Sequence, residues 1–301
     1  MKNWAVFLTT VLILSLTALI ILNKKPPPLV SPVAGQKGVL GISQWFPKAV
    51  NGPIEPIKVS AKAAFFVDTK SGEALYAKKI HDRLPVASLV KVMTVLIALE
   101  HKKIDDKFLV SQRAAGMEPD KMFLIAGEKL SLRELLSGIF LVSANDGAEV
   151  LAEGVTGDRS EFLKLMNAKA RQLGMKNTYF ANPTGLDEDI NNSYSSAYDL
   201  VILTRYLIRH HSEVVDISSS EHIYLPQTPE HQDYDMYTGI NLLTTYPGVV
   251  GFKTGYTPEA GLTLITLARK DGHEVVGVLL GSEDRRDEAR ELLNYSFGKL
   301  K

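Results

Sequence analysis

The stretch "LPVASLVKVMTVLIALEHKK", residues 84–103, combines an apolar helical pattern with two polar side chains. Pro85 and Ser88 are typical of a helix start, and residues 92–99 carry apolar side chains at the i, i+3, i+4 and i+7 spacing of a buried face. Positions three apart share one face of a helix, so the Ser88 hydroxyl and the Lys91 amine can meet. A cap serine followed by a solvated lysine also fits these residues, and the rest of the chain has to distinguish the two interpretations.

The chain has an ordinary globular composition with no excess of charge. Of its 301 residues, 45% are hydrophobic and 23% charged, and 34 Lys and Arg balance 34 Asp and Glu. A neutral chain has no net field that attracts polyanions, so we do not expect nucleic acid as a partner. The absence of cysteine excludes thiolate catalysis and Cys-ligated zinc, and the scattered histidines predict neither a metal site nor a cofactor.

The N-terminus carries the run "WAVFLTTVLILSLTALIILN", residues 4–23, which is long and apolar enough to span a bilayer as a helix. No A-x-A-like cleavage site follows it, so we expect residues 1–23 to be an uncleaved membrane anchor, with a cleaved signal peptide as the alternative. Lysines flank the run on both sides and leave its orientation open.

Residues 24–56 are rich in Pro and Gly without a sustained period and predict a linker with an extended, polyproline-like start. Trp45 and Phe46 are unusual in a tether, and we expect them to dock on the folded domain instead. That domain is predicted to occupy residues 57–301.

Within the domain, strand patterns enclose a helical region. Residues 61–80 read as a hairpin, the Ser88 helix follows, and residues 104–240 read mostly as helices. Residues 261–281 predict a second hairpin, and residues 283–300 an amphipathic helix. This order predicts one α/β unit, of the α+β kind, in which an antiparallel sheet is flanked by helices and carries an inserted helical subdomain.

Two further polar triplets stand at the ends of apolar runs. Ser143 and Asn145 follow the apolar helix "LLSGIFLV", while Lys253, Thr254 and Gly255 follow "YPGVVGF". Singly, each triplet fits a helix-end cap or a strand-edge lysine. In the order S-x-x-K, S-x-N, K-T-G, the three patterns are typical of class A β-lactamases and penicillin-binding proteins.

The residue types explain why this set supports acyl transfer. A serine hydroxyl is a weak nucleophile until a base takes its proton, and a lysine serves as that base when burial or nearby positive charge lowers its pKa. Lys91, inside an apolar helix, meets the first condition, and Lys253 would supply the second. Ser143 can relay a proton between Lys91 and a leaving amine.

The remaining groups suit substrate binding. Asn145 can donate to a substrate amide carbonyl or hold Lys91 in place. The backbone N–H groups of Ser88 and Tyr256 are candidate donors to a developing oxyanion, and the Thr254 hydroxyl can bind a substrate carboxylate.

Residues 61–297 resemble the peptidase domain of the serine D-alanyl-D-alanine carboxypeptidases, the low-molecular-mass penicillin-binding proteins. Beyond the triplets, the resemblance rests on the phrases "FANPTGLDEDINNSYSSAYDLVILTRYLI", "GVVGFKTGYTPEAGLTLITLARKDG" and "ARELLNYSF". It implies a β-lactamase-like or D,D-peptidase-like fold and removal of the terminal D-Ala from peptidoglycan stem pentapeptides through an acyl-serine. It also implies covalent inhibition by β-lactams and no metal or cofactor.

Carried onto this sequence, the resemblance implies Ser88 as nucleophile and Lys91 as general base. It implies proton relay and substrate orientation for Ser143 and Asn145, and a substrate-binding role for Lys253, Thr254, Gly255 and Tyr256. Such an enzyme works outside the cytoplasm, so we expect a catalytic domain held at the outer face of the cell membrane by the single N-terminal anchor.

Three alternative functions fit part of this pattern. A class A β-lactamase needs an E-x-x-L-N phrase for its deacylating carboxylate, and in "ARELLN" Glu291 stands one residue too close. A D,D-endopeptidase acting on cross-links uses the same residues and is not separable by sequence. A catalytically silent muropeptide-binding module would have no need of the Ser88–Lys91 pair.

Overall fold

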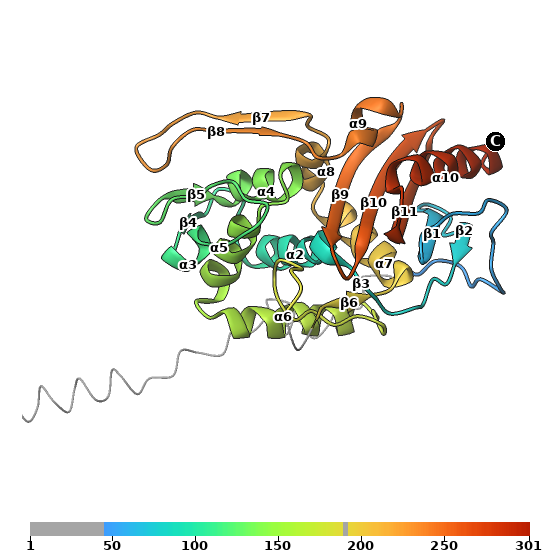
Figure 1. Cartoon of the computed structure of the whole chain (residues 1–301), viewed down its shortest axis with the longest axis horizontal. Helices are drawn as coiled ribbons and strands as arrows, with labels where there is room; N and C mark the ends of the chain where they lie inside the picture. The colour runs from blue at the N-terminus through green and yellow to red at the C-terminus, as the bar shows by residue number, and fades with distance from the viewer. Residues whose placement is uncertain (1–44, 189–191) are drawn as a thin grey trace, which may run out of the picture. The chain divides into compact units, whose positions relative to one another are not determined.

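A five-stranded antiparallel sheet organises the domain (Figure 1), with strand order β2-β1-β11-β10-β9. The computed structural model describes residues 45–188 and 192–301. The predicted anchor, residues 1–23, and residues 24–44 of the predicted linker lie outside the described residues. The strands of the sheet are β1 (Ala63–Asp68), β2 (Ala74–Lys78), β9 (Val249–Thr257), β10 (Gly261–Lys270) and β11 (His273–Ser282).

Both faces of the sheet are covered, each by a core of its own. Successive side chains of a strand point to opposite sides, so one strand contributes to both cores. In β1, Phe65 and Val67 join the core beneath the helical region, whereas Phe66 belongs to a second core with Leu292 and Phe297. The helix that builds this second core is α10 (Arg285–Lys299), visible over the sheet in Figure 1. The predicted hairpins at 61–80 and 261–281 and the C-terminal helix are confirmed.

The helical subdomain lies between β2 and β9 in the sequence. Its central helix α2 packs against α5, α6 and α7, and of these α7 packs against β1 and β11 of the sheet. Its helices are η1 (Ala87–Val90), α2 (Lys91–His101), α3 (Gln112–Ala115), α4 (Leu132–Leu141), α5 (Asn145–Thr156), α6 (Arg159–Gln172), α7 (Ala197–His210), α8 (Glu213–Ser218) and, just before β9, α9 (Asn241–Thr245).

The predicted helical character of residues 104–240 is only partly right, since short strands interrupt the helices. Within this range β4 (Lys107–Leu109) pairs with β5 (Lys129–Ser131), and β7 (His222–Leu225) pairs with β8 (Tyr234–Tyr237), while β6 (Tyr194–Ser195) pairs with β3 (Leu84–Pro85), which precedes it. Each has two to four residues, which is too short for an alternating pattern to stand out against helical neighbours.

The start of the helix at Ser88 also differs from expectation. Residues 87–90 form a 3₁₀ turn, and the α-helix proper begins at Lys91. The cap positions are Val86 and Val90, and neither helix start has a side-chain cap bond. The interpretation of Ser88 as a cap serine is therefore wrong, and its hydroxyl is free for another partner.

Residues 45–56, which the sequence assigns to the linker, contact the domain. The Arg205 guanidinium lies 4.3 Å from the Trp45 ring centroid, and the Lys48 N–H donates to the Gly72 carbonyl at 2.8 Å. Ile54 forms a β-bridge with Ala77. Among the described residues, no helix is both long and apolar enough to cross a membrane.

Candidate active site

The Lys91 amine lies between the Ser88 hydroxyl and a backbone carbonyl. Its Nζ is 2.8 Å from Ser88 Oγ and donates to the Thr184 carbonyl, also at 2.8 Å. Lys91 is fully buried and Ser88 almost so. The predicted meeting of hydroxyl and amine on one helix face is therefore present. Thr184 was missed by the sequence reading, because a main-chain acceptor leaves no residue-type signal.

The surroundings of Lys91 favour its neutral form. Burial lowers the pKa of Lys91 well below its usual value, and the Lys253 cation lowers it further, while Asp120 and Asp146 oppose the change. The partners of the amine are a hydroxyl and a carbonyl rather than a carboxylate, so no direct ion pair restores its charge. A lysine held in this way can accept a proton from a serine.

A second loop packs closely against the backbone around Ser88. Ala87 has a φ of +50°, a left-handed value that alanine rarely adopts. Gly185, at φ +82°, faces it so closely that an added Cβ would lie 1.9 Å from the Ala87 carbonyl oxygen. Only glycine fits there, and the loop 182–186 thus forms one wall of the turn that carries Ser88.

Ser143 lies in the connection between α4 and α5, also with a left-handed φ of +60°. Its Oγ accepts a hydrogen bond from Lys253 Nζ at 2.9 Å, and the same amine donates to the Thr254 carbonyl at 2.7 Å. The structure thus joins the S-x-N and K-T-G triplets through Ser143 and Lys253. The hydrogen bonds of Ser143 and of Lys91 lead to different partners, so a relay between them needs the substrate or a water molecule in place.

Asn145, the first residue of α5, is fixed by the loop that precedes β5. Its Nδ2 donates to the Pro119 carbonyl, and its backbone N–H donates to the Asp120 carbonyl at 2.8 Å. The buried Oδ1 has no hydrogen-bond partner among the described residues. The Lys91 amine bonds Ser88 and Thr184 instead, so the expected role of Asn145 in holding Lys91 is wrong.

Gly255 allows β9 to approach the nucleophile. A Cβ at this position would lie 2.9 Å from the Ser88 backbone nitrogen and 2.6 Å from Thr263 Oγ1. The third residue of K-T-G is therefore glycine because the strand backbone passes directly beside Ser88. Tyr256, the next residue, has an exposed side chain.

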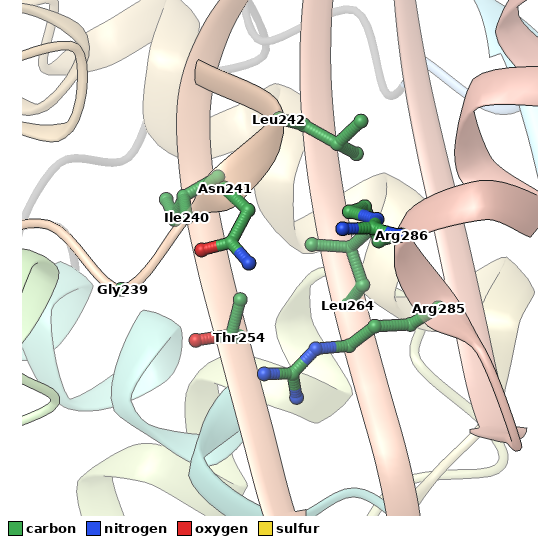
Figure 2. Close-up of a pocket in the computed structure, with 8 residues that line it drawn as sticks. All are labelled: Gly239, Ile240, Asn241, Leu242, Thr254, Leu264, Arg285 and Arg286. Atoms are coloured by element: carbon green, nitrogen blue, oxygen red, sulfur yellow. The ribbon is translucent and has the colours of Figure 1, made fainter. Parts of the chain in front are cut away.

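Arg285 is a site residue that the sequence reading missed. Its Nη1 donates to the carbonyl of Gly255 at 2.6 Å and to that of Thr263 at 3.3 Å. Figure 2 shows its guanidinium beside Thr254, in a hollow that Asn241 also lines. In "EDRRDEA" it resembles an ordinary charged residue at a helix start, so only the packing of α10 on the sheet reveals it.

Two basic side chains thus lie at the K-T-G triplet, Lys253 within it and Arg285 beside Gly255. Burial and then the Arg285 charge lower the pKa of Lys253 to about 7, against an opposing effect of Asp120. Burial also lowers the pKa of Arg285, which still leaves a guanidinium charged at neutral pH. This end of the site therefore suits an anionic group of a substrate.

A family model for D-alanyl-D-alanine carboxypeptidases, peptidase family S11, matches residues 49–284. The chain belongs to this family. The match extends from the docked N-terminal segment to the strand before α10 and includes all three triplets. The predicted family and the predicted fold are thereby confirmed.

Curated relatives and solved structures agree with the match. D-alanyl-D-alanine carboxypeptidase DacF of Bacillus subtilis is 36% identical over 247 residues, covering 79% of this chain and 62% of that protein. DacA of Haemophilus influenzae is 31% identical and covers 82% and 64%. The chain thus spans under two thirds of the length of these two relatives.

Penicillin-binding protein D2 from Listeria monocytogenes, in the cefotaxime-bound form, has 31% sequence identity and a TM-score of 0.67, covering 80% of this chain and 98% of that one. The D-alanyl-D-alanine carboxypeptidase DacD from Francisella tularensis has 28% identity and a TM-score of 0.74, covering 87% and 75%.

Gly255→Ala should abolish most acyl transfer in this carboxypeptidase homologue, because the new Cβ collides with the Ser88 backbone. We expect the rate of Ser88 acylation to fall about 100-fold, the scale of a 1 Å misplacement. Gly298→Ala is the matched control, since nothing lies within 4 Å of its added Cβ. Equal acylation rates in the two variants, measured with a fluorescent penicillin, would contradict the close approach.

The pKa of Lys253, lowered to about 7, predicts a pH dependence. Below that pH the amine is protonated and attracts an anionic substrate; as pH rises through about 7 the charge is lost, so kcat/KM should fall. Lys253→Arg keeps its charge and should lose this alkaline limb, even at a lower absolute rate. If the alkaline fall of kcat/KM occurred at the same pH in Lys253→Arg as in the wild type, it would reflect the titration of a group other than Lys253.

Proposed function

We propose that this chain is a serine D,D-carboxypeptidase that removes the terminal D-Ala from peptidoglycan stem pentapeptides. The observation that carries the proposal is the buried Lys91 amine, 2.8 Å from Ser88 Oγ and held by the Thr184 carbonyl. A silent binding module would gain nothing from burying an amine beside a hydroxyl. Family membership supplies the reaction class.

In the acylation step, neutral Lys91 takes the proton from Ser88 Oγ as the oxygen attacks the carbonyl carbon of the penultimate D-Ala. The negative charge on the carbonyl oxygen is stabilised by the backbone N–H groups of Ser88 and Tyr256. The proton passes from Lys91, through a water molecule or the bound substrate and then Ser143, to the nitrogen of the terminal D-Ala, and the C–N bond breaks. An acyl-serine remains on the enzyme, and free D-Ala leaves.

Deacylation reverses the roles with water as the nucleophile. The Lys91 amine again acts as the base and takes a proton from a water molecule, while the water oxygen attacks the carbonyl carbon of the ester. The Ser88–acyl bond breaks, and the proton returns to Ser88 Oγ. The products are the shortened stem peptide and the free enzyme.

The terminal carboxylate of the substrate would bind at the cationic end of the site. Lys253 and Thr254 are the expected contacts, and Arg285 adds a second cation beside the same strand. Specificity for a free C-terminus follows, because an amide or ester terminus would leave two cations unpaired.

The same machinery should react with β-lactams, whose strained amide carbonyl meets Ser88 as the peptide carbonyl does. Solved relatives are in the cefotaxime-bound and ampicillin-bound forms. We therefore propose that β-lactams acylate Ser88 and act as covalent inhibitors.

D-alanine release from a muropeptide ending in D-Ala-D-Ala tests the function directly. The full chain in detergent should release D-alanine, and Ser88→Ala should not. A cross-linked muropeptide dimer in parallel distinguishes the D,D-endopeptidase, which would cleave the dimer at a comparable or higher rate. A folded wild-type chain that cleaves neither substrate would leave the silent binding module as the explanation.

For location, we propose that residues 4–23 anchor the chain in the cell membrane with the domain on the extracytoplasmic side. The support is the length and apolarity of the run and the site of the peptidoglycan substrate. The full chain should sediment with membranes and be cut by protease added to spheroplasts. A chain beginning at residue 24 should lose membrane binding; a full chain protected from protease would overturn the orientation.

A further inference from the structure

The turn that holds Lys91 is shaped by one buried asparagine. Asn182 Oδ1 accepts from the backbone N–H groups of Thr184 at 3.2 Å and of Gly185 at 2.6 Å. On its other side, Nδ2 donates to the Leu186 carbonyl at 2.9 Å and to Glu188 Oε1 at 3.0 Å. An Asn side chain that bonds its own backbone in this way fixes a turn, so the direction of the Thr184 carbonyl depends on Asn182.

That carbonyl decides where the base points. A neutral amine has two N–H groups and one lone pair, and Thr184 takes one N–H at 2.8 Å. The lone pair is then free to face Ser88 Oγ, 2.8 Å away. A rotation of the Thr184 carbonyl would turn the Lys91 lone pair away from the hydroxyl without breaking the fold.

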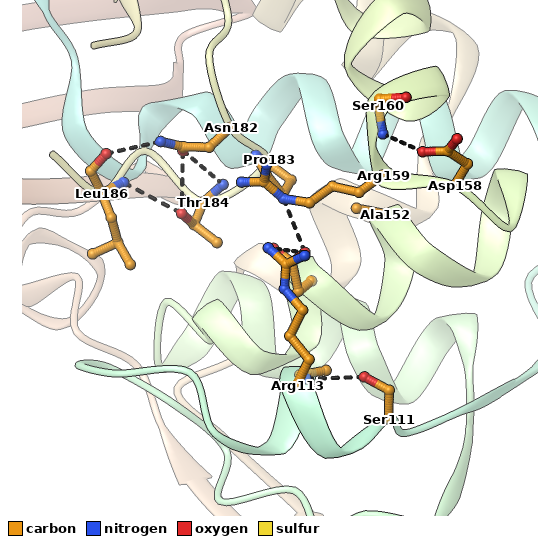
Figure 3. A network of polar contacts seen from close by, with 12 residues as sticks. Ser111, Arg113, Ala152, Asp158, Arg159, Ser160, Asn182, Pro183, Thr184 and Leu186 are labelled. Carbon is orange, nitrogen blue, oxygen red and sulfur yellow. Dashed lines mark hydrogen bonds and ion pairs between the residues drawn. The ribbon is translucent and has the colours of Figure 1, made fainter. Parts of the chain in front are cut away.

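Arg159 connects this turn to the buried interior of the helical subdomain. Its Nε lies 3.0 Å from Oε1 of Glu149, a fully buried carboxylate on α5, and its Nη2 lies 3.6 Å from Glu188 Oε1. Figure 3 shows the Arg159 side chain extending to Asn182 and Pro183. Glu188 Oε1 therefore receives both the Asn182 amide and the Arg159 charge.

Arg113 approaches the same carboxylate from the other side. Its Nη2 lies 3.2 Å from Glu149 Oε1. This is the one ion pair that Arg113 forms among the described residues. Figure 3 shows the Arg113 and Arg159 guanidinium groups converging. Burial raises the pKa of Glu149, while Arg159 and Arg113 both act against it. The two arginines thus share a buried partner, but only Arg159 pairs with Glu188.

We propose that Arg159 is a positioning residue for the general base. It holds Glu188, Glu188 holds the Asn182 amide, and Asn182 orients the Thr184 carbonyl that aims Lys91 at Ser88. This inference rests on the proposed function, because it assigns Lys91 as the base. Arg159 itself touches no reacting atom.

The test compares Arg159→Gln with Arg113→Gln in the full chain. Both variants leave Glu149 with one arginine, so the loss of thermal stability should be similar. We expect the saturating rate of acylation by a fluorescent penicillin to fall about tenfold in Arg159→Gln and to stay within about twofold of wild type in Arg113→Gln. The penicillin concentration that gives half of the saturating rate should not change, because Lys253 and Thr254, the expected contacts of the penicillin carboxylate, are left intact.

Glu188→Gln is the second variant, and it decides the matter if Arg159→Gln does not fold. Glu188 is exposed, so its replacement should not endanger folding. We expect the saturating rate to fall about threefold, because the amide keeps an acceptor for Asn182 but loses the charge that Arg159 holds. The double variant, which combines Arg159→Gln with Glu188→Gln, should be acylated no more slowly than Arg159→Gln alone, because both changes break the same chain of contacts.

Equal saturating rates in Arg159→Gln and Arg113→Gln, or an unchanged rate in Glu188→Gln, would reject the positioning role while leaving the proposed function intact. The positioning role would also be rejected if the loss of rate in the double variant equalled the product of the losses in the two single variants. A wild-type chain that neither releases D-alanine nor becomes acylated would reject the proposed function and, with it, the role of Arg159.

Discussion

The burial of the Lys91 amine beside Ser88 is the constraint on which the rest of the structure depends. Placing a cation in a protein interior is costly, and folds usually compensate with a carboxylate. Here the partners are a hydroxyl and the Thr184 carbonyl, and Lys253 adds a like charge nearby. The interior therefore lowers the pKa of the amine and favours its neutral form. Burying the amine in this way lowers the stability of the fold, and it is the condition that the proposed base role of Lys91 requires.

Three distant segments have to meet around that amine. The turn before α2 carries Ser88, the α4–α5 connection carries Ser143, and β9 carries Lys253. Because β9 is the edge strand of the central sheet, one of its sides is left to lie against the helical subdomain. The Lys253–Ser143 hydrogen bond spans this boundary, so the site exists only when the sheet and the helical insert are correctly docked.

The sequence predicted the parts of this arrangement that residue type and spacing encode. The Ser88–Lys91 contact follows from a separation of three on a helical turn, and the hairpins around the helical region follow from alternating apolar residues. Thr184 and Arg285 could not be predicted in the same way. One contributes only its backbone carbonyl, and the other is a surface-type arginine that tertiary packing brings to Gly255.

The two left-handed residues show where the site's strain lies and what supports it. Ala87 and Ser143 have positive φ, a conformation that costs non-glycine residues about 1–2 kcal/mol each. Such conformations persist only when the surrounding structure over-determines them. For Ala87, Gly185 and Gly255 supply that support: each lacks the Cβ that would push its backbone away from the Ala87–Ser88 turn. Glycines that look like ordinary loop and strand residues in the sequence are therefore required by the strained turn that carries Ser88.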